Sequence, residues 1–263
     1  MHPMLNIAIR ATRAAGDFIV RQMDRTQDIP VEVKSRNDFV TEVDKTAESI
    51  IIETIHASYP QHAILAEETG ATGDNEYRWI IDPLDGTTNF LHGFPQFAVS
   101  IALQHNGILD QAVVYDPLRQ ELFTASRGQG AHLNNRRIRV SSQISLEGAL
   151  LGTGFPFKDN DLLEDYLNTF RAFFPMSAGI RRAGAASLDL AYLACGRLDG
   201  FWEFKLNIWD IAAGALLIQE AGGLIGELSG GMNYLDSGNV VAANPKLFKC
   251  MLKSLKDTQD MSI

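Results

Sequence analysis

The sequence predicts a mixed α/β protein with two lobes of stacked layers. The first half is typical of an α+β arrangement, with two amphipathic helices followed by a run of antiparallel strands. The second half alternates strands and helices. We place the change near residue 145, so residues 1–144 form an α+β lobe and residues 145–263 an α/β lobe. A chain of 263 residues with 46% hydrophobic composition can bury a core of that size.

Two helices are predicted at the start of the chain. Pro3 suits the first turn of a helix, and Thr41 suits the cap of a second helix that ends before Tyr59-Pro60. The apolar stripe of the first helix consists of Leu5, Ala8, Ile9, Thr12, Ala15 and Ile19. The inner face of the second consists of Ala47, Ile50, Ile51, Thr54 and Ile55.

Short strands follow in the first lobe. Residues 64–66 and 79–81 are predicted as strands, separated by a polar loop over residues 70–77. The alternation over residues 97–105 predicts a half-buried strand, and Asn106-Gly107 predicts a hairpin turn after it. The remaining predicted strands of this lobe are residues 109–116 and 121–126.

The second lobe is predicted as alternating elements. Its predicted strands are residues 149–155, 201–204, 224–228 and 239–243. Its predicted helices are residues 162–174, 185–194, 210–221 and 245–255.

The net charge, the cysteine content and the absence of long apolar runs limit which partners and which cellular location the protein can have. A net charge of −9 argues against direct, sequence-independent binding to DNA or other nucleic acid, which needs a basic surface. Two unclustered cysteines, Cys195 and Cys250, indicate no disulfide framework and fit a reducing compartment. The opening residues lack the apolar core of a signal peptide, and no run approaches the ~20 apolar residues of a membrane span. We therefore expect a cytoplasmic protein without a membrane partner.

The stretch WIIDPLDGTTNF, residues 79–90, ends an apolar run with two aspartates. Pro83 restricts the backbone after Asp82, and Gly86 frees it after Asp85, so we expect a sharp turn here. Such a turn can hold both carboxylates on one side. Because like charges held close repel each other, a positive group is expected between them.

Four acidic positions lie at the end of an apolar strand or the start of a helix: Glu67 (beside Glu68), Asp82, Asp85 and Asp210. Alone, each has a structural explanation, namely a solvated loop edge, an Asx-type turn or a helix N-cap. If they converge, two divalent cations would neutralise them. Oxygen ligands suit Mg²⁺, and the six histidines show no ligand spacing for zinc.

Gly86 and Thr87 add a possible phosphate site. Backbone N–H groups at a glycine turn that opens a helix bind phosphate well, and the Thr87 hydroxyl could hold a water molecule. The sequence contains no G-x-S-x-G, no P-loop and no complete dinucleotide fingerprint. These observations together indicate metal-assisted phosphoryl transfer to water.

Three stretches resemble the signatures of the inositol monophosphatase family. They are EE at 67–68, DPLDGTTNF at 82–90 and WDIAAGALLIQEAGG at 209–223, and the separation of 128 residues between Asp82 and Asp210 (210 − 82) fits the family. The resemblance covers nearly the whole chain. It implies a five-layer αβαβα sandwich of the inositol monophosphatase and fructose bisphosphatase type, usually dimeric. It also implies a lithium-sensitive, Mg²⁺-dependent phosphatase that hydrolyses inositol 1-phosphate.

The resemblance also implies roles for single residues. Glu67, Asp82 and the Leu84 carbonyl would surround one metal, and Asp82, Asp85 and Asp210 a second, with two or three Mg²⁺ in the site. Glu67 and Thr87 would position the attacking water. The implied substrate contacts are Asp85, Gly86, Thr87, Gly184, Ala185, Glu203 and Asp210.

For some positions the sequence allows both a functional and a purely structural explanation, or leaves the role in the site open. Lys34, Asp38 and Asp44 lie in a segment resembling the family's mobile metal-associated loop, and a solvated loop explains them equally well. Ala185 stands where the family often has a hydroxyl residue, so a polar contact to substrate would be absent. Lys205 stands where a small residue is common; it would either extend over the site and favour an anionic leaving group or point into solvent.

Other functions remain open. Related folds cleave sugar bisphosphates, nucleotide 3′-phosphates, histidinol phosphate and NADP, so another small phosphate ester is an alternative substrate. The first residues and the segment SRNDFVTEVDK are most similar to a bacterial member of the family. That resemblance implies a regulatory role in ribosomal RNA antitermination, through RNA polymerase or elongation factors.

Arg181-Arg182 is a candidate contact for such a partner, although adjacent arginines are also typical of a solvated or dimer-facing pair. A structural ion site without catalysis is disfavoured, since calcium loops follow another ligand spacing and Thr87 would have no role.

Overall fold

The structure, a computed structural model, describes residues 2–23, 31–35, 38–157 and 159–260. The helices are α1 (Pro3–Gln22), α2 (Glu42–His56), α3 (Thr87–Leu91), α4 (Leu163–Phe173), α5 (Ala186–Ala194), α6 (Ile208–Glu220), α7 (Tyr234–Ser237) and α8 (Pro245–Asp260). Within the described ranges, no helix is both long and apolar enough to cross a lipid bilayer.

The strands make two large sheets and a small ribbon. The first sheet contains β3 (Ala63–Ala66), β4 (Gly70–Thr72), β5 (Tyr77–Asp85), β6 (Ala98–His105), β7 (Ile108–Asp116), β8 (Glu121–Ser126), β9 (Gly130–Leu133) and β10 (Arg136–Arg137). The second contains β11 (Leu150–Thr153), β12 (Gly179–Arg181), β13 (Gly200–Glu203), β14 (Leu224–Gly226) and β15 (Val240–Ala243). The ribbon is β1 (Val31–Ser35) paired with β2 (Asp38–Thr41).

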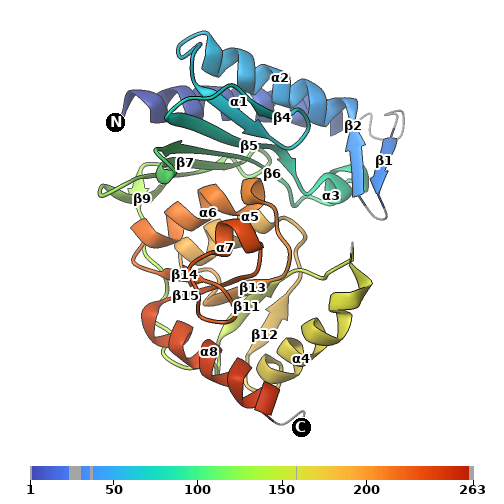
Figure 1. The fold of residues 1–263 in the computed structure, drawn as a ribbon, viewed down its shortest axis with the longest axis vertical. Helices are drawn as coiled ribbons and strands as arrows, with labels where there is room; N and C mark the ends of the chain where they lie inside the picture. The colour runs from blue at the N-terminus through green and yellow to red at the C-terminus, as the bar shows by residue number, and fades with distance from the viewer. Residues whose placement is uncertain (1, 24–30, 36–37, 158, 261–263) are drawn as a thin grey trace.

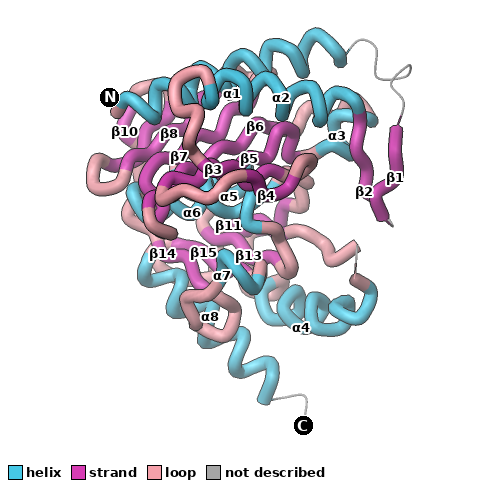
Figure 2. The backbone as a smooth tube through the Cα atoms, turned by 45° about the horizontal axis from the view of Figure 1, so that its top comes forward, coloured by secondary structure: helices cyan, strands magenta, loops and turns pink. Residues whose placement is uncertain are grey.

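Helices and sheets alternate in five layers (Figure 1). The layers are α1 with α2, the eight-stranded sheet, α5 with α6, the five-stranded sheet, and α4 with α8. The predicted αβαβα sandwich is therefore confirmed. The ribbon of β1 and β2 stands at one side of the eight-stranded sheet (Figure 2).

The outer helices form as the sequence predicts. The predicted stripe of α1 is buried apart from Ile9, which is half-buried. Thr41 caps α2 by accepting the backbone N–H of Val43, at 3.0 Å between nitrogen and Oγ1. Of the predicted inner face of α2, Ala47, Ile51 and Ile55 are buried, while Ile50 and Thr54 are only half-buried.

The eight-stranded sheet has the order β10-β9-β8-β7-β6-β5-β3-β4 and is antiparallel except where β3 pairs with β5. Asn106 and Gly107 both have positive φ, 50° and 77°, which confirms the predicted tight hairpin between β6 and β7. The prediction of a polar loop over residues 70–77 is wrong in part, because β4 occupies residues 70–72. β4 forms by antiparallel pairing with β3, whose residues lie four to eight positions earlier in the chain.

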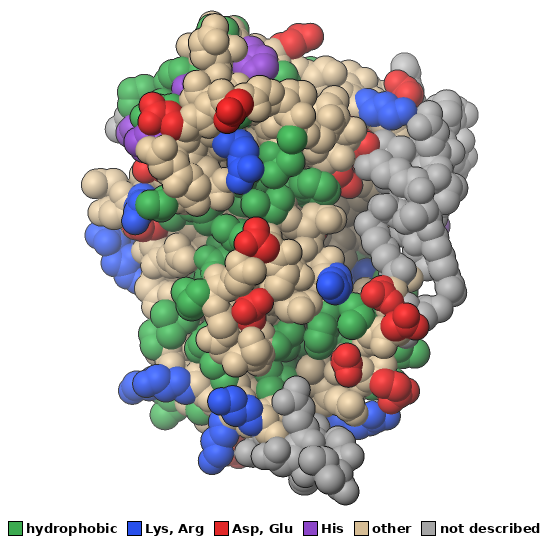
Figure 3. Space-filling view, in the orientation of Figure 1, with side chains coloured by type: hydrophobic (Ala, Val, Ile, Leu, Met, Phe, Trp, Pro, Cys, Tyr) green, Lys and Arg blue, Asp and Glu red, His purple; other side chains and the backbone are tan. Residues whose placement is uncertain are grey.

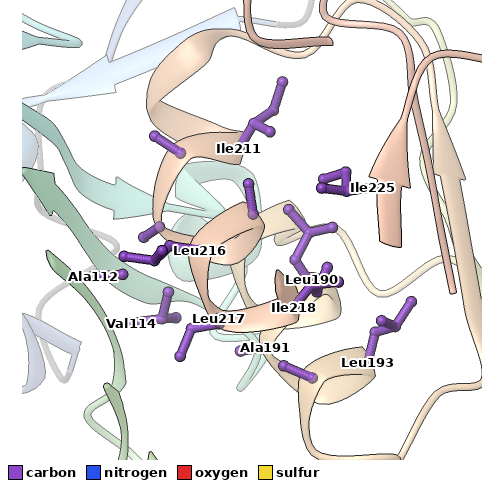
Figure 4. Close-up of a cluster of buried hydrophobic side chains, with 14 of the residues drawn as sticks. Ala112, Val114, Leu190, Ala191, Leu193, Ile211, Leu216, Leu217, Ile218 and Ile225 are labelled. Carbon is purple, nitrogen blue, oxygen red and sulfur yellow. The ribbon is translucent and has the colours of Figure 1, made fainter. Parts of the chain in front are cut away.

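The central strands are buried on both faces, which corrects the half-buried prediction for β6. Val113 and Tyr115 of β7 pack beneath α1, whereas Ala112 and Val114 of the same strand face the middle layer. Figure 4 shows these two residues beside Leu216 and Leu217 of α6. Helices cover both faces, so alternation in the sequence reflects side-chain size more than exposure.

The middle layer is tightly packed because a glycine allows α5 and α6 to approach. A Cβ added to Gly214 of α6 would lie 2.5 Å from the Cβ of Leu190 in α5, closer than side chains allow. Almost all of α5 and the central residues Ile211 to Ile218 of α6 are buried, and α6 also contacts the eight-stranded sheet and β14. The two helices thus join the two sheets through one core.

The five-stranded sheet has the order β12-β11-β13-β15-β14. The second-lobe strands and helices are confirmed within a few residues, and β12, which the sequence did not suggest, is added at one edge. Its parallel partner β11 ends at the cavity described below. Trp202 of β13 is fully buried beneath α4, and its indole N–H donates to the hydroxyl of Thr169, at 2.9 Å.

A row of stacked rings lies at the end of the eight-stranded sheet. The rings of Tyr59, His62 and Tyr77 stack in sequence, with centroids 4.7 and 4.8 Å apart. His62 Nδ1 accepts a hydrogen bond from the indole N–H of the buried Trp79, at 3.1 Å. Burial and the nearby His56 hold the pKa of His62 below its ordinary value, while Glu76 opposes the shift.

We predict that acid destabilises the protein through His62. Protonation places a second donor on Nδ1 opposite the Trp79 N–H, and a depressed pKa means that the unfolded chain binds this proton first. Stability from this group is therefore present above its unfolded pKa and lost as the pH falls below it. Between pH 7.5 and 5.5, wild type should lose up to roughly 1 kcal/mol more unfolding free energy than His62→Asn, which keeps an acceptor.

Urea unfolding followed by tryptophan fluorescence at both pH values measures this difference. His132→Asn, in β9 away from the stacked rings, is the control and should keep the wild-type pH dependence. Identical pH dependence in wild type and His62→Asn would contradict the prediction.

Candidate active site

A cavity of about 450 Å³ opens where β5, α3, β11, β13 and the first turns of α5 and α6 meet. The residues to which the sequence analysis assigned roles as metal ligands, catalytic groups or substrate contacts all line this cavity: Glu67, Asp82, Leu84, Asp85, Gly86, Thr87, Gly184, Ala185, Glu203 and Asp210. Lys205 also lines it. The structure thus brings together segments separated by more than a hundred residues.

The end of β5 carries both aspartates of the DPLDG stretch. In a regular strand Asp82 and Asp85, three residues apart, would point to opposite faces. However, Asp82 pairs with Ser100 and Asp85 with Ala98, so β5 has one more residue than β6 over this interval. This bulge turns both carboxylates toward the cavity. The predicted sharp turn thus takes the form of a bulge within the strand, which continues to Asp85, followed by a turn at Gly86, where φ is 93°.

Asp82 is buried among the other acids of the cavity. Its Oδ1 accepts the backbone N–H of Leu84 at 3.0 Å, which is the predicted Asx-type turn. Burial raises its pKa well above the ordinary value, and the charges of Glu67, Asp85 and Asp210 raise it further. The four carboxylates are therefore close enough to repel one another.

Asp85 is held by α5. Its Oδ2 accepts the backbone N–H of Ser187 at 2.7 Å and the Ser187 hydroxyl at 2.5 Å. Burial raises the pKa of Asp85 to about 6, and hydrogen bonds from Ser187 and the backbone of Ala186 and Leu188 oppose that rise. Ser187 was not among the predicted site residues, because nothing in the local sequence of a helix 102 residues away signals this contact.

Glu67 follows β3 in a turn that α2 supports. Its backbone N–H donates to the carbonyl of Ile81, at 3.1 Å. The buried Glu48 of α2 accepts the backbone N–H groups of Glu68 and Thr69, at 2.8 and 2.9 Å. Glu48 was also missed; a single acid on the buried face of a helix was the available signal.

Asp44 and Thr87 are coupled. Asp44 Oδ1 accepts the Thr87 hydroxyl at 3.0 Å, and Asp44 Oδ2 accepts the hydroxyl and N–H of Thr41 at 2.5 and 2.9 Å. Burial raises the pKa of Asp44, and these hydrogen bonds oppose the rise. Asp44 is thus buried rather than part of a solvated loop. Side chains at Lys34 and Asp38 lie outside the described part of the structure.

The turns at Gly86 and Gly184 are linked by hydrogen bonds, beside the backbone N–H groups of Gly86 and Thr87 that are candidates for binding phosphate. A Cβ on Gly86 would lie 2.8 Å from the carbonyl oxygen of Gln96, so only glycine fits there. The Asn89 amide of α3 donates to the carbonyls of Gln96, Ala183 and Gly184, at 2.7, 2.9 and 3.2 Å. This side chain ties the DPLDG turn to the segment that opens α5.

Asp210 and Glu203 also line the cavity. Together with Glu67, Asp82 and Asp85 they form what we call the acidic wall. Asp210 lies in the first turn of α6, and its Oδ2 accepts the N–H of Asn207 at 2.7 Å. Asn207 is the N-cap, so the N-cap explanation for Asp210 is wrong by three residues. Burial raises the pKa of Glu203, as do Asp189 and Asp210. Its carboxyl group would overlap a Cβ on Gly154, so it lies inside the cavity rather than at a solvated strand end.

The outer wall of the cavity is aromatic and cationic. The Arg182 guanidinium lies over the rings of Phe155 and Phe157, 5.4 and 4.9 Å from their centroids. Lys205 is an exposed residue at the rim with a φ of 55°. Asp189, buried in α5, also lines the cavity and was missed; burial and Asp85 raise its pKa.

The acidic wall suits a hard divalent cation in its chemistry. Its donors are carboxylate oxygens, together with the carbonyl of Leu84, which are the ligands that Mg²⁺ prefers. In the part of the chain that the structure describes, no three acidic, histidine or cysteine side chains are yet drawn together closely enough to hold an ion. A divalent cation would relieve the repulsion among the carboxylates.

We predict that Asn89→Asp destabilises the protein by ~2 kcal/mol, because it replaces an amide donor by an acceptor facing three carbonyls without changing the size of the side chain. Urea unfolding at neutral pH measures the change. Asn75→Asp is the matched control, since Asn75 uses its oxygen as an acceptor of the Tyr77 N–H, which aspartate retains. Equal effects in the two variants would contradict the assigned role of Asn89.

The fold and the cavity define a five-layer α/β protein with an acidic site between its sheets. The family model described as "Inositol monophosphatase family" matches residues 1–260. The chain belongs to the inositol monophosphatase family.

Individual relatives agree with this assignment. The chain is 58% identical over 262 residues to Nus factor SuhB of Pseudomonas aeruginosa, with 97% of each chain covered. Extragenic suppressor protein suhB from Bartonella henselae has a similar crystal structure, with a TM-score of 0.94, 42% identity, and 97% and 99% of the two chains covered. Inositol monophosphatase from Anabaena sp. is similar with a TM-score of 0.84, 38% identity, and 96% and 95% coverage.

Proposed function

We propose that the protein is a Mg²⁺-dependent phosphomonoesterase that hydrolyses inositol 1-phosphate to inositol and phosphate. The observation that carries this proposal is the convergence of four repelling carboxylates beside the Gly86-Thr87 turn in one cavity. Family membership supports the reaction class. The cavity volume of about 450 Å³ suits a small substrate.

The acidic wall would hold the cations. Glu67, Asp82 and the Leu84 carbonyl would bind one Mg²⁺, and Asp82, Asp85 and Asp210 the next. When bound, the cations neutralise the phosphate and lower the pKa of a water molecule. Backbone N–H groups of Gly86 and Thr87 would bind phosphate oxygens.

Glu67 and Thr87 would position the attacking water. The Thr87 hydroxyl directs its proton to Asp44 Oδ1 or to the Leu84 carbonyl, 3.0 and 3.1 Å away. Its oxygen is then an acceptor for one hydrogen of the water. Glu67 would accept the other hydrogen and act as general base. Asp44, held by Thr41, keeps the Thr87 hydroxyl in this orientation.

The alcohol of the substrate would lie against the second lobe. Glu203 would accept hydrogen bonds from its hydroxyl groups, and Gly184 allows close approach of the backbone. Ala185 is 1% exposed and carries no polar group, consistent with the missing substrate contact. The alternative substrates, namely sugar, nucleotide and histidinol phosphate esters, are distinguished by a panel of esters assayed at equal concentration.

We predict that Asp85→Asn abolishes turnover and leaves the fold intact. Loss of residues that merely support a metal ligand costs ~10–100-fold in activity, so removing a ligand charge should lower kcat by more than ~100-fold. The amide oxygen can still accept from Ser187, and one repelling charge is removed, so the metal-free variant should be at least as stable as wild type.

The assay is phosphate release from inositol 1-phosphate with Mg²⁺, with and without lithium, and after chelation of the metal. Lithium and chelation should each suppress the wild-type activity. Asp110→Asn, on β7 and outside the residues that line the cavity, is the control and should remain active. Full Mg²⁺-dependent activity of Asp85→Asn would disprove the site assignment.

A second role in transcription is supported by the 58% identity to a protein named Nus factor SuhB. We propose that the chain also contacts the transcription machinery, as a cytoplasmic homodimer. Arg181 and Arg182 are exposed at the end of the edge strand β12. The exposed Phe174 and Met176 precede this strand and are available for contact with a second copy. Acidic side chains gather around α4 (Figure 3), which disfavours direct nucleic-acid binding on that face.

We predict that immobilised protein captures RNA polymerase or an elongation factor from lysate, identified by mass spectrometry. Arg181→Ala with Arg182→Ala should reduce capture by about tenfold, because the pair supplies two exposed cations to an acidic partner. Arg136→Ala with Arg137→Ala, an equally exposed pair on β10, is the control. Capture of neither factor by wild type would count against this role.

A further inference from the structure

Ser187 is a buried hydroxyl residue of α5, a helix that also carries the buried Asp189, and it touches the proposed metal site. Ser187 is 0% exposed, and its Oγ–H and its backbone N–H both donate to Asp85 Oδ2, at 2.5 and 2.7 Å. We infer that Ser187 is a positioning residue that orients the Asp85 carboxylate for the cation. This inference rests on the proposed function.

The geometry indicates that Ser187 fixes the orientation of the Asp85 carboxylate, and does not merely give the buried hydroxyl a hydrogen-bond acceptor. Two donors from one residue meet at the same carboxylate oxygen, so the carboxylate cannot rotate about its Cβ–Cγ bond without breaking one of them. Asp85 lines the cavity, so a carboxylate held in this way can offer its other oxygen to a cation there without reorienting. A preorganised ligand loses less entropy when it binds its cation.

Asp85 also acts as a cap for the helix that carries Ser187. The N-cap residue of α5 is Ala185, whose side chain cannot accept a hydrogen bond. Asp85, from β5, approaches the backbone N–H groups of Ala186, Ser187 and Leu188 in its place. A Ser187→Ala variant keeps these backbone contacts, so it removes the hydroxyl alone and leaves the helix capped.

Within the RRAGAAS segment, Ser187 is the residue that carries a side-chain hydroxyl, two positions after Ala185. Ala185 is buried within the middle-layer core, whereas Ser187 reaches the carboxylate. The hydroxyl group in this segment therefore serves the acidic wall rather than the substrate.

The test is the Mg²⁺ dissociation constant of Ser187→Ala, measured by calorimetry without substrate. Loss of a hydrogen bond to a ligating carboxylate should weaken Mg²⁺ binding by ~10-fold. At saturating Mg²⁺, kcat should return to within about threefold of wild type, because the ligands themselves are unchanged. Ser187→Thr, which keeps the hydroxyl, should restore the wild-type Mg²⁺ affinity.

Ser126→Ala is the matched control. It removes a serine hydroxyl that also donates at 2.5 Å, but to the neutral side chain of Gln111 and away from the cavity, so its Mg²⁺ affinity should match that of wild type. A lower melting temperature of Ser187→Ala with unchanged Mg²⁺ affinity would overturn the inference in favour of a purely structural role. Wild type that neither binds Mg²⁺ nor releases phosphate would instead overturn the proposed function, and the inference with it.

Discussion

Electrostatic repulsion among carboxylates that folding has removed from water is the constraint on which this site depends. Asp82 lies among Glu67, Asp85 and Asp210, and both burial and these charges disfavour its ionised form. An unpaired buried charge costs several kcal/mol, so the chain must supply compensation. It does so with donors fixed by the backbone: the N–H of Leu84 for Asp82, of Ser187 for Asp85 and of Asn207 for Asp210. Each donor binds one oxygen of its carboxylate. The negative charge that remains would be neutralised by divalent cations.

The position of these donors follows from the layered core. Asp85 comes from the eight-stranded sheet, while its donors come from α5, which is packed against α6 through the contact between Gly214 and Leu190. The middle layer belongs to both sheets, so the acidic wall is set by large-scale packing rather than by a loop. Asn89, which follows the end of β5, also hydrogen-bonds directly to the segment that precedes α5. A rigid support of this kind is what an oriented set of ligands requires.

The two proposed roles meet at Arg182. Its guanidinium lies on Phe155 and Phe157 at the rim of the cavity, and its neighbour Arg181 ends the edge strand β12. A partner that binds this edge would therefore lie beside the entrance to the acidic wall. The proposed substrate site and the proposed partner site would then lie next to each other on the protein.

The local pattern of the sequence determined much of this protein by itself. Pro3, Thr41 and the apolar stripes specify α1 and α2, Asn106-Gly107 specifies a hairpin, and the acidic positions mark the site, because each of these signals acts over a few residues. Tertiary structure alone decided the rest. The bulge that turns Asp82 and Asp85 to one side depends on pairing with β6. Glu48, Asp44 and Ser187 became part of the site through contacts across 20 to 102 residues. The partners in such contacts cannot be read from the local sequence, since they meet only when packing brings distant segments together.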